Sequence, residues 1–234
     1  MTHPVLHLEH VTAERPSGRG PVRVLDAVTL SVAPGELVAL MGPSGSGKTS
    51  LLHVACGLLA PTAGTVSIDG HPMSPTDRAG WATARRRVVG VVHQRLDLLP
   101  GLDVLDNVAL PLLLDGARVR AAHVEAREAL DRLGIAELAA AKPAELSVGE
   151  QQFVAVARAV AGQRRLVLAD EPTAALDTVA AERVVEVLAD LAGSGTAVLM
   201  ATHDARLGSW ADRVHDLRDG SLAAVAALDD RSTR

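Results

Sequence analysis

The segment 42–49, which reads Gly-Pro-Ser-Gly-Ser-Gly-Lys-Thr, restricts the fold of this chain more than any other part of its sequence. A short apolar run at 37–41 precedes it, and a stretch with helical character at 50–57 follows it. A strand, a glycine-rich loop and a helix in this order turn successive backbone N–H groups toward one anion at the helix N-terminus. In such a loop Lys48 reaches the β- and γ-phosphates of a nucleotide, and the Thr49 hydroxyl holds Mg²⁺.

The alternative interpretation of this segment is an ordinary glycine-rich turn that happens to contain a lysine. All fixed positions of the phosphate-loop pattern and both flanking elements are present, so we predict a nucleoside triphosphate site with Mg²⁺. The nucleotide is expected to contact the loop and the first residues of the helix, namely Gly42, Pro43, Ser44, Gly45, Ser46, Gly47, Lys48, Thr49 and Ser50.

The composition limits what else the chain can be. With 234 residues, of which 48% are hydrophobic, it can bury one core and is expected to be globular. No apolar run approaches the roughly 18 residues that span a bilayer, and the first residues lack the features of a signal peptide. A formal charge of −5 argues against a nucleic-acid partner. We therefore expect a cytoplasmic protein that reaches any membrane through a partner, with its one cysteine, Cys56, buried as a small apolar residue.

The hydrophobic pattern changes twice along the chain. Strands are predicted first, with a turn-rich loop at 15–21 and a tight turn at 69–70; the predicted strands are 5–11 (an edge strand), 24–32, 36–41, 65–68 and 88–92. Helices follow, at 104–114, 121–133, 135–141 and 148–161. The alternation then returns, with a strand at 166–169, a helix at 178–192, a strand at 197–201 and a closing hairpin at 216–226. The order predicts one domain over residues 1–234, an α/β nucleotide-binding core with a helical insertion at about 104–162.

A second candidate site lies where the apolar strand 166–169 ends in two adjacent carboxylates, Asp170 and Glu171. Mg²⁺ bound at Thr49 requires a carboxylate from the other side of the site. Because adjacent residues of a strand point to opposite sides, the two acids are expected to have different roles. We assign Asp170 to the Mg²⁺ shell and Glu171 to polarising the attacking water. Taken alone, such a strand end would be an ordinary exit into a loop.

The start of the helix 148–161 offers a third candidate site. Ser147 with Glu150 three residues later forms the pattern of a capping box, which is a sufficient structural reason for both residues. The free N–H groups of the first turn, which contains Gly149, can also bind an anion. The two interpretations are compatible, and the anion can be the γ-phosphate of a nucleotide bound to another subunit.

With these motifs the chain resembles the ATP-binding subunit of an ABC transporter over nearly its whole length. Six motifs occur in the order of that family: Walker A at 42–49, the Q-loop at Gln94, a signature-like segment at 146–150, Walker B at 166–171, the D-loop at 174–177 and the H-loop at His203. The resemblance implies a P-loop NTPase core with a mixed β-sheet, an N-terminal antiparallel β-subdomain and an inserted α-helical subdomain. The phrase 107–112, together with the phosphate loop, is most similar to the MacB, LolD and FtsE branch.

The resemblance also implies roles for individual residues. Two copies stack head to tail as a homodimer, and Ser147, Gly149 and Glu150 of one copy face the ATP of the other. Asp177 couples the two sites. Gln94 contacts Mg²⁺ or the water, and His203 holds the γ-phosphate, so that the catalytic set is Lys48, Gln94, Glu171 and His203. Without the resemblance, Gln94 would be taken for a surface residue and His203 for a loop histidine.

The implied partners are integral membrane permease subunits on the inner face of the cell membrane. The segment 95–100 and the helical subdomain are expected to form a groove for a short helix of the permease. The alternative for the leucines of this region is an ordinary core.

The chain departs from the family pattern at three positions. Arg15 stands where the family stacks adenine on an aromatic residue, and a guanidinium plane can also lie on the base. We therefore expect weaker and less base-selective binding. Val148 replaces a glycine of the signature and is acceptable only if its φ is negative. Phe153 replaces an arginine near the expected interface. None of these changes affects Lys48, Asp170, Glu171 or His203, so we expect an active ATPase.

The motifs are compatible with more than one function. The leading one is the ATP-hydrolysing subunit of a MacB/LolD-type transporter for lipoproteins, peptides or drugs. The alternative is an FtsE-like ATPase that regulates cell division or cell-wall hydrolysis through a membrane protein without transport. DNA-repair relatives are disfavoured because no long heptad segment separates Walker A from the signature, and translation-factor relatives because they carry two such domains. A module that no longer hydrolyses ATP is disfavoured by the intact catalytic set.

Overall fold

A six-stranded sheet forms the centre of the molecule in the computed structural model, which describes residues 3–18 and 20–223. Its strand order is β10-β9-β3-β8-β7-β6. The pairs among the five larger strands are parallel, and β10 joins β9 in the antiparallel direction. The strands are β3 (Leu37–Met41), β6 (Val89–Val92), β7 (Leu166–Asp170), β8 (Ala197–Ala201), β9 (Arg213–Arg218) and β10 (Ser221–Leu222). Every residue of β7 and β8 is buried, because parallel sheets are covered on both faces.

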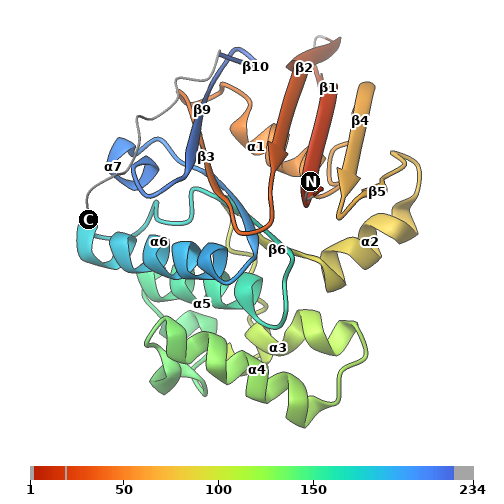
Figure 1. Cartoon of the computed structure of the whole chain (residues 1–234). Helices are drawn as coiled ribbons and strands as arrows, with labels where there is room; N and C mark the ends of the chain where they lie inside the picture. Colours follow the sequence, from red (N-terminus) through yellow and green to blue (C-terminus); the bar gives the residue numbers. More distant parts are fainter. Residues whose placement is uncertain (1–2, 19, 224–234) are drawn as a thin grey trace.

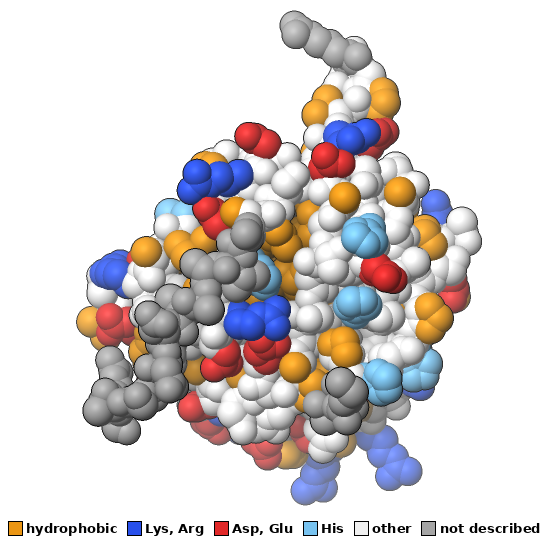
Figure 2. All heavy atoms as spheres, turned by 45° about the horizontal axis from the view of Figure 1, so that its top comes forward, with side chains coloured by type: hydrophobic (Ala, Val, Ile, Leu, Met, Phe, Trp, Pro, Cys, Tyr) orange, Lys and Arg blue, Asp and Glu red, His pale blue; other side chains and the backbone are white. Residues whose placement is uncertain are grey.

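A second, antiparallel sheet lies beside this core and has the strand order β2-β1-β4-β5 (Figure 1). Its strands are β1 (Leu6–Ser17), β2 (Gly20–Val32), β4 (Ala63–Ile68) and β5 (His71–Pro72). The helix α1 (Lys48–Ala55) contacts β1 and β2 of this sheet and β7 and β8 of the core sheet. Figure 2 shows several histidine side chains on the half of the molecule where Figure 1 places this sheet. His7, His10 and His71 belong to its strands.

The helices α3 to α6 lie at the end of the molecule opposite the antiparallel sheet, whereas α2 lies near β5 and α7 near β9 (Figure 1). Their bounds are α2 (Arg78–Arg87), α3 (Val104–Leu114), α4 (Val119–Arg132), α5 (Val148–Val160), α6 (Thr178–Gly193) and α7 (Ala205–Gly208), with 3-10 turns at Ala136–Leu138 and Pro143–Glu145. The helices α3, α4 and α5 contact one another, and α5 also packs against β6. No helix among the described residues is both long and apolar enough to cross a bilayer.

Alternation along the core strands divides the buried side chains between two clusters. Leu37 and Ala39 of β3 pack with the helices α3 to α6, whereas Val38 and Leu40 pack with α1 and the antiparallel sheet. Successive side chains of a strand point to opposite faces, so one short apolar run serves both cores. This double burial fixes β3, and with it the start of the phosphate loop.

The structure corrects the predictions for the N-terminal hairpin. The first strand is not an edge strand, because β1 lies between β2 and β4. The segment 15–21 is not a turn-rich loop: Arg15 pairs with Val22, and Pro16 with Pro21, so the ladder continues to Ser17. Two opposed prolines are tolerated there because a directly opposed pair that exchanges no N–H bonds needs no amide hydrogen.

One helical prediction is wrong, and two helices were missed. The helix predicted at 135–141 is only the 3-10 turn Ala136–Leu138. Neither α2 nor α7 was predicted. In α2 only Trp81 and Ala84 are buried among many arginines, so the apolar period is too weak to detect. The four residues of α7 are too few to show a period.

The closing hairpin was predicted correctly around its turn. Asp219 (φ 47°) and Gly220 (φ 79°) form the left-handed pair that a two-residue hairpin turn between β9 and β10 requires. Residues 224–226 of the predicted hairpin lie outside the described residues. The other predicted strands, and the helices of α1 and α3 to α6, are confirmed within a few residues.

A substitution at Gly90 in β6 tests the close packing of α5 against the core sheet. A Cβ built at Gly90 would lie 1.9 Å from the carbonyl oxygen of Ala159 in α5. We expect Gly90→Ala to push α5 away from the sheet and to lower the free energy of unfolding by about 1–3 kcal/mol. Urea unfolding measures this change. The control is Gly193→Ala, since a Cβ at Gly193 at the end of α6 has open space around it, and the exchange should be neutral or stabilising. Equal stability of the two variants would contradict the prediction.

Candidate nucleotide-binding site

The phosphate loop connects β3 to α1 and depends on glycines at the points of closest approach. Gly47 is the N-cap of α1 with φ 110°, a left-handed value that favours glycine. A Cβ at Gly42 would lie 2.1 Å from the carbonyl oxygen of Leu217 in β9. The amide of Gly220, in the closing turn, donates to the carbonyl of Ser46 at 2.9 Å. The loop is therefore held from behind by the last hairpin of the described chain.

Lys48 lies within this loop rather than in solvent. Its ammonium group donates to the carbonyls of Gly42 (2.7 Å) and Pro43 (3.1 Å), and the residue is 8% exposed. The hydroxyl of Ser46 is buried and has no hydrogen-bond partner within the described chain. A positive charge, an unpaired hydroxyl and the N-terminus of α1 thus meet at one place, which is the chemistry that binds a phosphate.

Asp170 supplies the acidic side of the site. It ends β7, is buried, and one of its carboxylate oxygens has no hydrogen-bond partner within the described chain. Burial raises the pKa of this carboxyl, and a hydrogen bond with the Thr49 side chain partly opposes the rise. An orphaned carboxylate oxygen beside a hydroxyl fits Mg²⁺, which prefers oxygen ligands. No cluster of three or more ligating side chains occurs among the described residues, so phosphate oxygens and water would complete the shell.

Glu171 does not continue the strand, which corrects the expectation that Asp170 and Glu171 are neighbours on one strand. Its φ is 49°, and its amide donates to the carbonyl of Ala201 at 3.0 Å. This turn directs its carboxylate toward His203, whose Nδ1 lies 2.9 Å from one oxygen and 3.0 Å from the other. Glu171 is largely buried and His203 is 70% exposed, so the pair lies at the mouth of the site. Backbone strain at Glu171 therefore separates the directions of the two acids.

The signature-like segment forms the expected cap at the N-terminus of α5. The Ser147 hydroxyl accepts from the Glu150 amide at 3.2 Å, and the Glu150 carboxylate accepts from the Ser147 amide at 2.7 Å. Val148 does not have a positive φ, so valine is tolerated at this position, and its side chain is 63% exposed. Gly149 lies near Leu176. The hydrogen bonds described for the start of α5 stay within this segment and do not reach the phosphate loop.

Asp177, Gln94 and Phe153 lie on three other parts of the fold. Asp177 is the N-cap of α6 and accepts from the Ala180 amide at 2.8 Å. Gln94 is exposed in the loop that follows β6. Phe153 is half-buried and packs against the core formed by the helices, so its immediate role is packing.

Arg15 has a partner that the sequence did not indicate. Its guanidinium donates to Nδ1 of His53 in α1 at 2.9 Å, and the His53 ring lies 6.4 Å from the ring of His93. Burial, followed by the charge of Arg15, lowers the pKa of His53, which keeps the ring neutral and able to accept. His93 directly precedes Gln94. Arg15 of β1, His53 of α1 and His93 of the loop after β6 therefore lie next to one another in this order.

The comparison with known proteins agrees with this site. Residues 25–174 match the family model described as ABC transporter. The lipoprotein-releasing system ATP-binding protein LolD of Ruegeria pomeroyi is 45% identical over 96% of this chain and 99% of its own length. The macrolide export ATP-binding/permease protein MacB of Chromobacterium violaceum is 41% identical over 93% of this chain, which spans only 34% of MacB. The chain therefore belongs to the ABC transporter family.

A solved structure defines the class further. The ATP-binding cassette MJ0796, in a dimeric post-hydrolysis state bound to ADP and Pi, has a TM-score of 0.90 and 34% identity over 96% of this chain and 99% of its own. The present chain has this ABC ATPase fold. It is an ATPase, the ATP-binding subunit of an ABC transporter, with relatives of the LolD and MacB type. Arg15, Asp177 and His203 lie outside the matched range 25–174.

The substitution Asp170→Asn should raise the stability of the protein and lower its ATPase activity. Because burial raises the pKa of Asp170, ionising this carboxyl costs more free energy in the folded state than in the unfolded chain, so the ionised form lowers stability at neutral pH. We expect the variant to melt about 2–4 °C higher at pH 7 without nucleotide, corresponding to about 1 kcal/mol. The difference should shrink as the pH falls through the raised pKa of the folded state and vanish below about pH 3, where Asp170 is protonated in both states. ATP hydrolysis with Mg²⁺ should fall about 100-fold.

The matched control is Asp177→Asn, because asparagine caps a helix as well as aspartate does and its melting temperature should not change. A melting temperature of Asp170→Asn equal to or below that of the unmodified protein would show that the buried carboxylate carries no such cost.

Proposed function

We propose that this chain energises a membrane permease of the MacB/LolD type, for lipoprotein, peptide or drug export, by ATP-driven head-to-tail dimerisation. Each ATP and its Mg²⁺ lie between the phosphate loop of one copy and the start of α5 of the other. The observation that carries the proposal is that two groups able to bind a phosphate lie apart in one chain. Lys48 lies with Asp170 and Glu171 at one edge of the sheet, whereas Ser147 caps a different helix.

Two exposed apolar side chains support the proposal that a second copy covers the start of α5 and the start of α6. Val148, next to Ser147, is 63% exposed, and Val179, two residues after Asp177, is 78% exposed. Both flank residues that the proposal places at the interface. Burying two such side chains against a second copy stabilises association, at about 25 cal/mol per Å² of apolar surface.

The proposed chemistry uses the chain's own groups in sequence. Lys48 and the N–H groups at the start of α1 neutralise the phosphates. Glu171 orients and polarises the water, while His203, which contacts Glu171 in this structure, holds the γ-phosphate. Mg²⁺, held by Thr49, Asp170 and Gln94, would supply a positive charge to the β- and γ-phosphate oxygens. Ser147 and Gly149 of the second copy complete the site, and Asp177 couples it to its twin.

The alternative function is an FtsE-like ATPase that regulates cell-wall hydrolysis through a membrane partner. The match to LolD over 99% of that protein's length is compatible with either function. The membrane protein that co-purifies with this chain distinguishes them: a permease with a large extracytoplasmic domain supports transport, and a small partner bound to wall hydrolases supports regulation. In both cases the chain lies in the cytoplasm, on the inner face of the membrane.

The seam can be tested with two substitutions. Glu171→Gln should slow ATP hydrolysis by about 10²–10⁴-fold, because the water loses its base, and should trap an ATP-bound dimer on size-exclusion chromatography. Adding Ser147→Arg, which places a long cation against the partner's nucleotide site, should abolish the dimer, while loss of the α5 cap should lower the free energy of unfolding of the monomer by only about 0.5–2 kcal/mol. The same cation at Ser194, at the far end of α6, serves as the control. Dimers that survive Ser147→Arg would rule out the head-to-tail arrangement.

Recognition of the base rests on Arg15 in this proposal. The guanidinium, oriented by His53, lies on the base in place of an aromatic ring. We expect the affinities for ATP and GTP to be within about one order of magnitude of each other, because a cation on a π-face gains only about 0.5–2 kcal/mol. Arg15→Ala should weaken both. Titration with fluorescent analogues measures this, and a strong ATP preference that disappears in Arg15→Ala would mean that Arg15 discriminates between the bases.

A further inference from the structure

The capping box at the start of α5 puts a carboxylate where the proposed function requires a phosphate to bind. The Ser147 hydroxyl accepts from the Glu150 amide at 3.2 Å and at the same time donates to the Glu150 carboxylate at 2.7 Å. The same carboxylate oxygen accepts from the Ser147 amide at 2.7 Å. A serine hydroxyl has one proton to donate, so in this structure Glu150 holds the proton that a phosphate oxygen would need.

The Glu150 carboxyl is ionised in this arrangement. The hydrogen bond from the Ser147 hydroxyl, followed by the one from the Ser147 amide, holds the pKa of Glu150 below its usual value. A carboxylate in the first turn is also stabilised by the partial positive charge at the helix N-terminus. Glu150 therefore uses, within its own chain, part of the positive potential that the γ-phosphate of another copy would use.

The charge of Glu150 has no counter-charge nearby. Residues 147–157 contain no lysine, arginine or histidine. The basic residues that flank this stretch, Lys142 and Arg158, donate to backbone carbonyls of the loop 96–101. Among residues 3–18 and 20–223, Glu150 takes part in no ion pair.

The side chains around Glu150 are apolar. Val148 is 63% exposed, and a Cβ built at Gly149 would lie 3.4 Å from the Leu176 side chain. Phe153, one turn further along α5, is half-buried. A second copy that covers this surface would take water away from the carboxylate without supplying a cation, and burial of an unpaired charge is costly.

The Glu150 carboxylate and a phosphate bound at Ser147 would lie close together. The hydroxyl is 2.7 Å from the carboxylate oxygen, and its hydrogen bond to a phosphate would be about 2.7 Å long, so the two oxygens would be at most about 5.5 Å apart. This separation is shorter than the Debye length of about 8 Å at physiological ionic strength, so salt screens the repulsion only in part. At the effective dielectric constant of a protein surface, two like charges at this distance change an equilibrium constant about tenfold.

We propose that Glu150 is a positioning residue that limits the ATP-driven association of two copies, because it holds the Ser147 hydroxyl proton and repels the γ-phosphate of the other copy's ATP. Closure of the seam between the copies then requires the hydroxyl proton to turn from the carboxylate to a phosphate oxygen, while the bond from the Ser147 amide keeps the cap in place. A seam weakened in this way reopens more readily. The inference rests on the proposed function, because it concerns the regulation of the same seam.

The dissociation constant of the ATP dimer tests this proposal on the full-length chain. Glu150→Gln is introduced into the slowly hydrolysing Glu171→Gln protein, since glutamine also completes a capping box and should preserve the helix start. With Mg²⁺ and ATP, we expect about tenfold tighter association for each of the two seams, and so a dimer dissociation constant about 100-fold lower by sedimentation velocity. This gain should decrease from about 0.1 M to about 1 M NaCl, as the Debye length falls from about 10 Å to about 3 Å.

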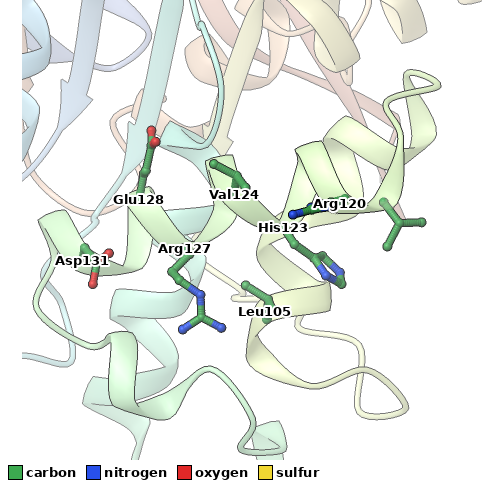
Figure 3. A pocket seen from close by; sticks show the side chains of 8 residues that line it. Leu105, Arg120, His123, Val124, Arg127, Glu128 and Asp131 are labelled. Carbon is green, nitrogen blue, oxygen red and sulfur yellow. The ribbon is translucent and has the colours of Figure 1, made fainter.

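The matched control is Glu128→Gln, which removes the same charge from a different helix. Figure 3 shows Glu128 on α4, beside a hollow that Arg127 also lines. This variant should leave the dissociation constant unchanged.

A cation placed beside Glu150 should have the same effect as removing its charge. Phe153→Arg puts a guanidinium three residues after Glu150, on the same side of α5, and should recover most of the gain. Added to Glu150→Gln, it should give no further gain, because no charge remains to be paired. Phe153→Gln controls for the lost packing and should not strengthen association.

Three results would overturn the inference. The first is the same dissociation constant with and without Glu150→Gln, and the second is weaker association in a Glu150→Gln variant whose melting temperature is unchanged. The third is a gain that does not change with salt, which would assign the effect to packing.

The Ser147→Arg variant separates these outcomes from failure of the proposed function. If ATP dimers form, are abolished by Ser147→Arg and do not respond to Glu150→Gln, the inference is wrong and the proposed function stands. If no ATP dimer forms either with or without Glu150→Gln, the proposed function itself is wrong.

Discussion

Parallel pairing of β3 and β7 with β8 is the interaction on which the site depends. Ala201 at the end of β8 is in register with Leu40 of β3 and with Asp170 of β7. Three chain segments that are far apart in the sequence therefore leave the sheet at one level: the phosphate loop, the turn at Glu171 and the loop that carries His203. Polar side chains at the carboxyl ends of parallel strands meet at one edge, and burial of both sheet faces makes this arrangement rigid.

The charged side chains at this edge of the sheet differ in how completely their hydrogen bonds are satisfied within the chain, and these differences match their proposed roles. Lys48 is satisfied by the loop's own carbonyls, and Glu171 by His203, so each has a partner that a nucleotide or water can replace. Asp170 keeps an unpaired oxygen. Away from the edge, Arg85, Arg158 and Arg164 donate to backbone carbonyls and form no ion pair with a carboxylate of the described residues. Under-compensated groups of this kind reduce the stability of the isolated chain and give a partner or an ion something to gain on binding.

The sequence revealed the parts of the site whose geometry is local. The phosphate loop, the Ser147 cap and the strand ending in Asp170 each depend on a few consecutive residues, and fully buried strands appear as unbroken apolar runs. Features that depend on distant partners were not accessible. The hairpin through Arg15 needs its second strand, the bond from Arg15 to His53 joins residues 38 apart, and the positive φ of Glu171 reflects the strand beside it. The arginine-rich α2 could not be recognised because its apolar period is masked.

The hydrogen bond from Gly220 to Ser46 has a consequence for synthesis on the ribosome. The chain emerges from its N-terminal end, so residues 42–49 are exposed to the cytoplasm long before β9 and β10 exist. Until those last strands dock, the Ser46 carbonyl lacks its donor and Gly42 lacks the Leu217 wall behind it. A nascent polypeptide halted before residue 213 thus contains the whole phosphate loop and still lacks the two strands that support it. The loop can take its final shape only after β9 and β10 have been synthesised and have docked.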